Sequence, residues 1–129
     1  MTTWLPNAKK PVEWVGTSKE DLSAMPTEVK STFGQALFDA QTGSKHPDAK
    51  PLRGFGGAGV LEIVEDFDGN AYRAVYTVKF EDAIYVLHAF QKKSKSGRAT
   101  PKRDLNLIES RLYLAQEHYE RTYRKKTTA

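Results

Sequence analysis

Residues 60–90 read VLEIVEDFDGNAYRAVYTVKFEDAIYVLHAF, and this stretch decides the fold. Two runs rich in β-branched and aromatic residues, VLEIVED and AYRAVYTVKF, flank the dipeptide Asp68-Gly69, which is typical of a hairpin turn. A short turn at Glu81-Asp82 then leads into AIYVLHAF, whose continuous apolar character predicts a strand buried in the middle of a sheet. The stretch therefore predicts consecutive strands joined by short turns.

Upstream of this meander the sequence predicts one short strand and two helices. Residues 10–16 alternate apolar and polar side chains, as a strand does. Thr17 begins a capping box and opens a short helix that Pro26 interrupts. Thr27 caps a longer helix, whose apolar residues recur at helical spacing until Gly43 ends it.

Downstream of the meander, Thr100-Pro101 predicts the start of a helix that runs to about residue 124, with proline at the first helical position. The predicted order of elements is β-α-α-β-β-β-α. We therefore expect an α+β fold in which helices pack on a small, mostly antiparallel sheet of about four strands. The chain of 129 residues is long enough for one domain with a single core.

The segment GFGGAG at residues 54–59 matches the G-x-G-x-x-G pattern of dinucleotide-binding loops. That loop must follow a strand and open a helix, because the helix N-terminus binds the pyrophosphate. Here the preceding HPDAKPLR is predicted to be loop, and the segment that follows is predicted to be a strand. We therefore expect no nucleotide cofactor, and glycines that adopt positive φ where the chain crosses the sheet edge.

The positive charge of the chain is concentrated in its C-terminal third. Residues 1–85 carry nine Lys or Arg and twelve Asp or Glu, whereas residues 86–129 carry eleven and four. A one-sided positive field attracts polyanions, above all nucleic acid. A solvated surface with a basic tail is the alternative. The aromatic and histidine residues interleaved with the cations of HAFQKKSKSGRATPKR favour nucleic acid.

Other classes of protein are excluded by what the sequence lacks. Without cysteine there can be no disulfide scaffold, cysteine-ligated zinc site or thiol nucleophile. His46 and His118 have no partners at ligand spacing, so no metal site is predicted. The sequence has neither the apolar region of a signal peptide nor a run of apolar residues long enough to span a membrane, so a cytoplasmic protein is expected.

Two segments, YRAVY at residues 72–76 and HAFQKKSKSGRATP at residues 88–101, carry a resemblance to a known family. Together with the order of elements, they resemble the HigB-like, phage-derived branch of the RelE/ParE toxin superfamily over nearly the whole chain. The resemblance implies a toxin of a two-gene toxin–antitoxin module. It implies a partner antitoxin, a small helix-turn-helix protein encoded next door. RelE and HigB types bind the ribosome and cut mRNA without a metal or other cofactor.

Such cleavage needs a base for the 2′-OH proton, a cation beside the phosphorane and an acid for the leaving 5′ oxygen. By the resemblance, Arg73 occupies the position of the transition-state arginine. The alternative is a structural ion pair with Glu62 or Glu65 across the hairpin. Lys92 and Lys93 follow the third strand, where the family carries a cationic pair. One of them could transfer a proton, or both could contact phosphate.

Two further residues could take part in the chemistry. A histidine titrates near neutral pH, so His88 is a candidate acid or base. His88 alternates with Val86 and Phe90, however, and could instead be a core residue. Glu62 matches a position that is a carboxylate in some relatives and a lysine in others, so it could be the base or the counter-ion of Arg73. The residues expected to bind RNA are Lys95, Arg98, Lys102, Arg103 and Phe90.

The sequence departs from the family in one respect. RelE-type members place a tyrosine shortly after the second cation, whereas SKSGRATP contains none. A stacking aromatic ring must therefore come from Phe90, Tyr72, Tyr76 or Tyr85, or this role is absent.

Two rival functions fit the same fold. The first is a ParE-like inhibitor of DNA gyrase without a nuclease site, although such a protein has no need of clustered phosphate-binding groups. The second is a non-catalytic, phage-derived remnant that binds RNA, since fold does not imply function. A helix-turn-helix gene beside this one would favour the toxin.

Overall fold

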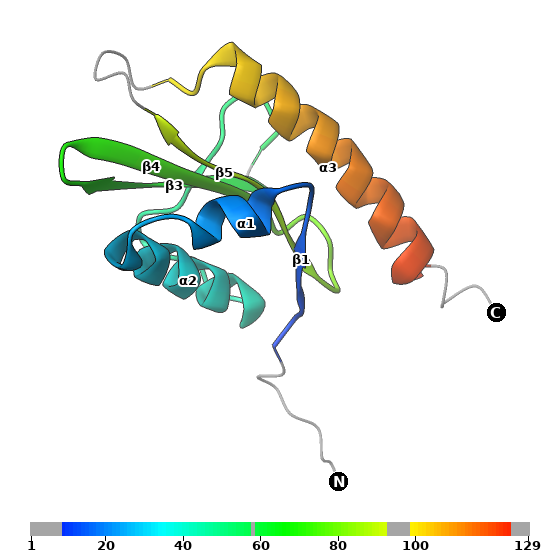
Figure 1. The fold of residues 1–129 in the computed structure, drawn as a ribbon. Helices are drawn as coiled ribbons and strands as arrows, with labels where there is room; N and C mark the ends of the chain where they lie inside the picture. The colour runs from blue at the N-terminus through cyan, green and yellow to red at the C-terminus, as the bar shows by residue number, and fades with distance from the viewer. Residues whose placement is uncertain (1–8, 58, 93–98, 125–129) are drawn as a thin grey trace, which may run out of the picture.

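The computed structural model describes residues 9–57, 59–92 and 99–124, which form one sheet with helices on both faces (Figure 1). The strands follow the order β1-β5-β4-β3-β2, with β1 parallel to β5 and all other neighbours antiparallel. In chain order the elements are β1 (Val12–Trp14), α1 (Ser18–Ser23), α2 (Thr27–Gln41), β2 (Lys50–Pro51), β3 (Val60–Phe67), β4 (Asn70–Thr77), β5 (Ile84–Lys92) and α3 (Lys102–Thr122).

This architecture confirms the expected α+β class, with one strand more than the four predicted. The additional strand is β2, which pairs through Lys50 and Pro51 with Glu62 and Leu61 of β3. Lys50 and Pro51 are too few for a periodic pattern and neither is β-branched. The sequence therefore predicts loop here. In the described part of the chain, no helix is both long and apolar enough to cross a membrane.

The hairpin of β3 and β4 forms as the Asp-Gly turn predicts. Asp68 and Gly69 have φ of 52° and 80°, and the flanking residues Phe67 and Asn70 pair directly. Positive φ at both central residues is the geometry whose twist matches that of the strands.

A β-bulge interrupts the pairing of β4 with β5. Val75 lies opposite His88 and Tyr76 lies opposite Val86, so Leu87 is an extra residue on β5. The bulge breaks the strict alternation along β5. Val86 therefore packs against α1 and α2, whereas His88, two residues further on, lies on the opposite face and contacts α3.

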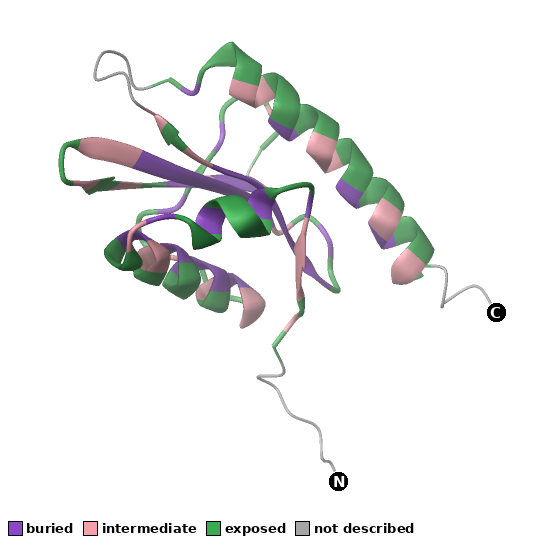
Figure 2. Ribbon diagram, in the orientation of Figure 1, coloured by how far each residue is buried: buried purple, intermediate pink, exposed green. Residues whose placement is uncertain are grey.

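The two faces of the sheet carry separate hydrophobic clusters. α1 and α2 cover one face, where Phe33, Ile63 and Tyr76 are buried. α3 covers the other, where Leu87 and Ile108 are fully buried. Figure 2 shows the buried positions along the strands and on the inner sides of α2 and α3. The sheet is thus the middle layer of three.

The helix ends agree only in part with the sequence. The Thr17 hydroxyl donates to the Asp21 carboxylate at 2.8 Å and caps no backbone N–H, and Thr27 is the first residue of α2 rather than its cap. Gly43 does end α2. Its φ is 88°, and the next N–H group, that of Ser44, donates to a carbonyl of the last turn at 2.7 Å.

The glycine-rich segment joins the antiparallel strands β2 and β3. Gly54, Gly56 and Gly57 have φ of 94°, 76° and 129°, as expected for glycines in a tight connection. A strand does precede this loop, contrary to the prediction, but β3 rather than a helix follows it. The loop therefore lacks the helix N-terminus that a dinucleotide-binding loop supplies.

Tyrosine hydroxyls fix the C-terminal half of α3 to the sheet and its turns. Such bonds from buried tyrosines combine apolar packing with a specific polar contact. The hydrogen-bonded pairs are Tyr85 with His118 at 2.7 Å, Tyr119 with Asp82 at 2.7 Å and Tyr123 with Glu13 at 2.5 Å.

Candidate active site

The residues predicted for the site come together on the sheet face that α3 covers. Arg73 on β4 lies opposite Phe90 on β5, and Glu62 on β3 and His88 on β5 both lie opposite Val75. Residues directly opposite each other share a face of the sheet, as do residues two apart along one strand. Since Val75 packs in the cluster beneath α3, all of these side chains lie on that face.

Arg73 forms a buried ion pair with Glu62, and Thr100 joins them. Arg73 Nη1 donates to Glu62 Oε2 at 3.1 Å and to Thr100 Oγ1 at 3.3 Å, and the Thr100 hydroxyl donates to the same carboxylate oxygen at 2.7 Å. The side chains of Arg73 and Glu62 are 7% and 15% exposed. Glu65 lies opposite Tyr72, on the other face of the sheet, and is not the partner of Arg73.

This cluster settles where Glu62 lies but leaves its chemical role a prediction. One carboxylate oxygen of Glu62 accepts from two donors, which is the position of a counter-ion. The geometry of a base, with a lone pair aimed at a substrate hydroxyl, would use the other oxygen. Thr100 was not predicted as a site residue, because Thr100-Pro101 was interpreted as the start of a helix.

His88 forms a second polar contact with α3. Its Nε2 lies 2.8 Å from Asp104 Oδ1, and its ring stacks on that of Phe90 with centroids 4.4 Å apart. A carboxylate only accepts, so Nε2 carries the proton. Nδ1 is buried and has no hydrogen-bond partner among the described residues. The alternation along the strand predicted that His88 shares a face of the sheet with Val86. That prediction is wrong, because the bulge at Leu87 places the two side chains on opposite faces.

Asp104 is a second residue, beside Thr100, that the sequence did not predict for the site. It is the acidic residue in the first turn of α3 and its side chain is 13% exposed. Asp104 is the first carboxylate after the basic stretch, and this position could have indicated a site residue. An acidic residue in the first turn of a helix is explained equally well by its interaction with the helix dipole.

The basic stretch begins and ends beside this site. Lys92, at the end of β5, donates from Nζ to the carbonyl of Ala99 at 2.8 Å. Lys102 and Arg103 are exposed on the first turn of α3. The remaining predicted cations, Lys93, Lys95 and Arg98, lie outside the described residues.

Among the aromatic residues considered for base stacking, Phe90 is the one on this face with a partly exposed ring. Tyr76 and Tyr85 are each 1% exposed, and Tyr76 packs on the opposite face. Tyr72 also lies on the opposite face. If an aromatic ring of the described chain stacks on a base at this site, Phe90 has the position for it.

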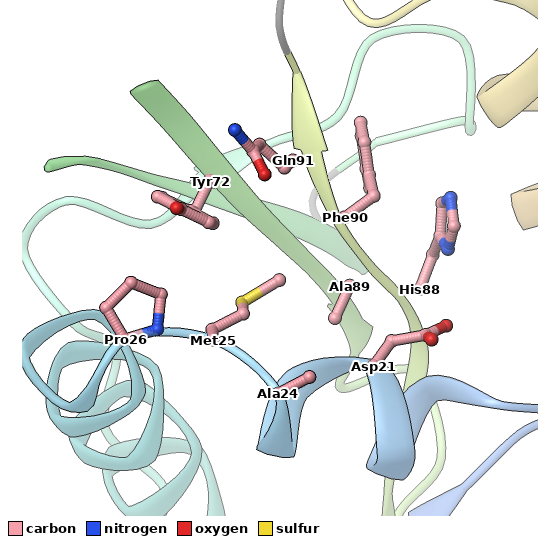
Figure 3. Close-up of a pocket in the computed structure, with 9 residues that line it drawn as sticks. All are labelled: Asp21, Ala24, Met25, Pro26, Tyr72, His88, Ala89, Phe90 and Gln91. Atoms are coloured by element: carbon pink, nitrogen blue, oxygen red, sulfur yellow. The ribbon is translucent and has the colours of Figure 1, made fainter. Parts of the chain in front are cut away.

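A pocket of about 370 Å³ lies between α1 and β5 (Figure 3). Met25, Pro26 and Tyr72 give it a largely apolar lining, with the Gln91 amide at its rim. His88 and Phe90 line it as well, so the pocket borders the site on β5. Among the described residues, no group of His, Asp or Glu could hold a metal ion.

Comparison with known proteins identifies the family. Residues 20–113 match the family described as phage derived protein Gp49-like (DUF891). This range runs from α1 into α3 and contains the whole meander. No curated protein matches the chain.

The chain is similar to several solved structures of toxins. A variant of the E. coli toxin RelE in the free state has a TM-score of 0.52 at 14% identity, over 83% of this chain and 97% of that one. The isolated E. coli RelE toxin has a TM-score of 0.48 at 17% identity, over 80% and 98%. The RelBE2 toxin–antitoxin complex of Mycobacterium tuberculosis gives 0.42 at 20% identity, over 67% and 95%.

The fold of E. coli RelE agrees with the resemblance drawn from the sequence, and the placement in the HigB-like branch stays a prediction. The matched range contains both polar contacts of the site. They are the cluster of Glu62, Arg73 and Thr100 and the pair of His88 and Asp104. The chain belongs to the family of phage-derived Gp49-like proteins.

Proposed function

We propose that this protein is the toxin of a two-gene toxin–antitoxin module and acts as a ribosome-dependent endoribonuclease that cuts mRNA and inhibits translation. The observation that carries the proposal is the Arg73 guanidinium, held by Glu62 and Thr100 on the sheet face where the basic stretch begins and ends. Its setting in a Gp49-like chain with the RelE fold supports the same reaction.

In this reaction the ribose 2′ oxygen attacks the adjacent phosphorus and the bond to the 5′ oxygen breaks. The products are a 2′,3′-cyclic phosphate and a 5′-OH, with one proton removed at the start and one delivered at the end. Arg73 stabilises the negative charge that develops on the equatorial phosphate oxygens, since a guanidinium fork matches their geometry. No metal ion or cofactor is part of the proposed mechanism.

Lys92 and Lys93 are the groups that we assign to proton transfer. Lys92 is at the end of β5 and its ammonium group reaches the carbonyl of Ala99, at the far side of the basic stretch. Glu62 is the counter-ion that orients Arg73. His88 is enclosed between Phe90 and Asp104, and the position of its ring suits holding Phe90 for a base to stack on.

The partners follow from the same proposal. The mRNA and ribosomal RNA meet the cations of the basic stretch, with Lys102 and Arg103 on the first turn of α3. A small helix-turn-helix antitoxin, encoded beside the toxin, binds and inhibits it in the cytoplasm.

The test is to induce the gene with and without its neighbour and to map mRNA 5′ ends. We expect new ends inside translated frames, and none when the neighbour is co-expressed. Arg73→Lys keeps the charge but loses the fork, and should lower cleavage by about 100- to 1,000-fold. Growth arrest with supercoiling defects and intact mRNA would instead identify a gyrase inhibitor, and no arrest would favour a non-catalytic remnant.

A further inference from the structure

Thr100 lies two residues before the first residue of α3, and its hydroxyl is turned to the sheet. The residue is 8% exposed, and no side chain caps the helix that follows. Its hydroxyl donates to Glu62 and accepts from Arg73, at 2.7 and 3.3 Å. Pro101, which has no polar side chain, occupies the N-cap position of α3, and the Thr100 hydroxyl before it contacts the buried ion pair.

The contact has a geometric effect on the guanidinium group. Nη1 carries two hydrogens that lie in the guanidinium plane, and it has two acceptors, Glu62 Oε2 and Thr100 Oγ1. These two acceptors are themselves hydrogen-bonded at 2.7 Å, so Arg73, Glu62 and Thr100 form one closed cluster that holds the end of the Arg73 side chain.

The position of Thr100 is itself held from β5. Asp104, one helical turn further on, bonds His88 at 2.8 Å. The start of α3 thus contacts the sheet at two points, on β3 and β4 through Thr100 and on β5 through Asp104. These contacts link the Arg73 guanidinium to β5, the strand that carries Lys92.

We infer that Thr100 is a positioning residue for the proposed reaction. Its hydroxyl orients the Arg73 guanidinium toward the phosphate, and Asp104 holds the turn that carries it. The inference rests on the proposed function. A displacement of about 1 Å at a positioned group can lower a rate by about 100-fold, so the loss of one hydroxyl contact should be measurable.

The experiment compares Thr100→Val, which keeps the shape, with Thr100→Ser, which keeps the hydroxyl. Single-turnover cleavage is measured on ribosomes programmed with mRNA and saturated with toxin, and ribosome binding is measured separately. We expect Thr100→Val to cut up to about 100-fold more slowly with unchanged binding, and Thr100→Ser to cut near the wild-type rate. Thr32→Val, which removes a hydroxyl bonded within α2, is the matched control.

A second readout does not depend on cleavage. NMR of the Arg73 side chain reports rotation of its guanidinium group, which should be slow in the wild type and in Thr100→Ser and faster in Thr100→Val. Circular dichroism establishes that each variant is folded, and Thr100→Ala replaces Thr100→Val if the valine is not accommodated.

The outcomes separate the two proposals. An active wild type with equally active Thr100→Val, or equal losses in Thr100→Val and Thr100→Ser, would overturn the positioning role and leave the proposed function intact. A wild-type protein that cuts no mRNA on ribosomes would overturn the proposed function, and the role of Thr100 with it.

Discussion

Arg73 is both the candidate catalytic residue and half of a buried ion pair, and the two roles can be separated. Removing one partner of such a pair leaves an uncompensated charge in a poorly solvated site, which costs about 3–5 kcal/mol. Removing both partners costs far less, because no charge is left behind. The stability of the fold and the activity should therefore respond differently to single and double substitutions.

We expect Arg73→Met to lower the free energy of unfolding by about 3–5 kcal/mol and to abolish toxicity. The double variant Arg73→Met/Glu62→Met should recover most of the stability, measured by urea denaturation, and remain non-toxic. Toxicity that returned with stability would show that Arg73 serves the fold alone.

At the scale of single residues, the position of the hairpin turn predicts which side chains of β3 and β4 lie opposite each other. Counting back from the Asp68-Gly69 turn places Val64 opposite Arg73, which puts Glu62 on the face of Arg73 and Glu65 on the other. The register thus distinguishes the two candidate partners. The contacts of Thr100 and Asp104 could not be obtained in this way, because they depend on how α3 lies across the sheet.

At the scale of elements, substitutions of two glycines by alanine should have opposite effects on stability. Gly34 is exposed in the middle of α2, with no atom within 4 Å of an added Cβ. Gly57 has φ of 129° in the loop between β2 and β3. Gly34→Ala should raise the free energy of unfolding by about 0.5–1 kcal/mol, because alanine loses less entropy in a helix.

Gly57→Ala should instead lower it by about 1–3 kcal/mol, since an L side chain is strained at that φ. Thermal and urea denaturation of the two variants give the comparison. Neutral behaviour of Gly57→Ala would mean that this loop adopts another conformation in solution.

The first turn of α3 and the end of β5 should differ in how they use their cations. Lys102→Ala should weaken ribosome binding and flatten the slope of log affinity against log salt by about one, because a phosphate contact is lost. Lys92→Ala should leave that slope nearly unchanged and lower the single-turnover cleavage rate. Lys19→Ala, an exposed cation on α1, is the control for a general charge effect. Identical behaviour of Lys92→Ala and Lys102→Ala in both assays would contradict the division.

The elements themselves were predictable where local patterns decide them. The Asp-Gly hairpin, the amphipathic α2 and the helix after Pro101 all appear where the sequence placed them. β2 was missed because its pairing comes from β3 rather than from its own residues. The bulge at Leu87 was missed because alternation alone cannot reveal an inserted residue.

At the scale of the whole molecule, buried tyrosines make stability depend on alkaline pH. Burial, with a smaller effect of Asp39, raises the pKa of Tyr76 to about 12, and burial with a bond to Glu13 raises the pKa of Tyr123 to about 12. In the unfolded chain a tyrosine ionises near pH 10. The unfolded state therefore loses these protons first as the pH rises.

The contribution of these tyrosines is fully present below about pH 10 and is lost between about pH 10 and 12. We expect the free energy of unfolding, measured by urea denaturation from pH 8 to 12, to fall over that window. Each such tyrosine steepens the fall by up to about 1.4 kcal/mol per pH unit. Tyr76→Phe should flatten the decline, whereas Tyr113→Phe, at a residue that is 70% exposed, should not. An unaltered decline in Tyr76→Phe would contradict the assignment.

The parallel pairing of β1 with β5 constrains when the sheet can form during synthesis of the chain. β1 leaves the ribosome first, but its partner Ile84–Lys92 and the Tyr123 that bonds Glu13 are synthesised much later. Domains generally fold as units, and contacts distant in the chain form only after the segment between them exists. A nascent chain that stops before α3 therefore has an unfinished sheet and no Thr100 beside Arg73. A chain that ends anywhere ahead of α3 should therefore lack the folded arrangement of Arg73, Glu62 and Thr100.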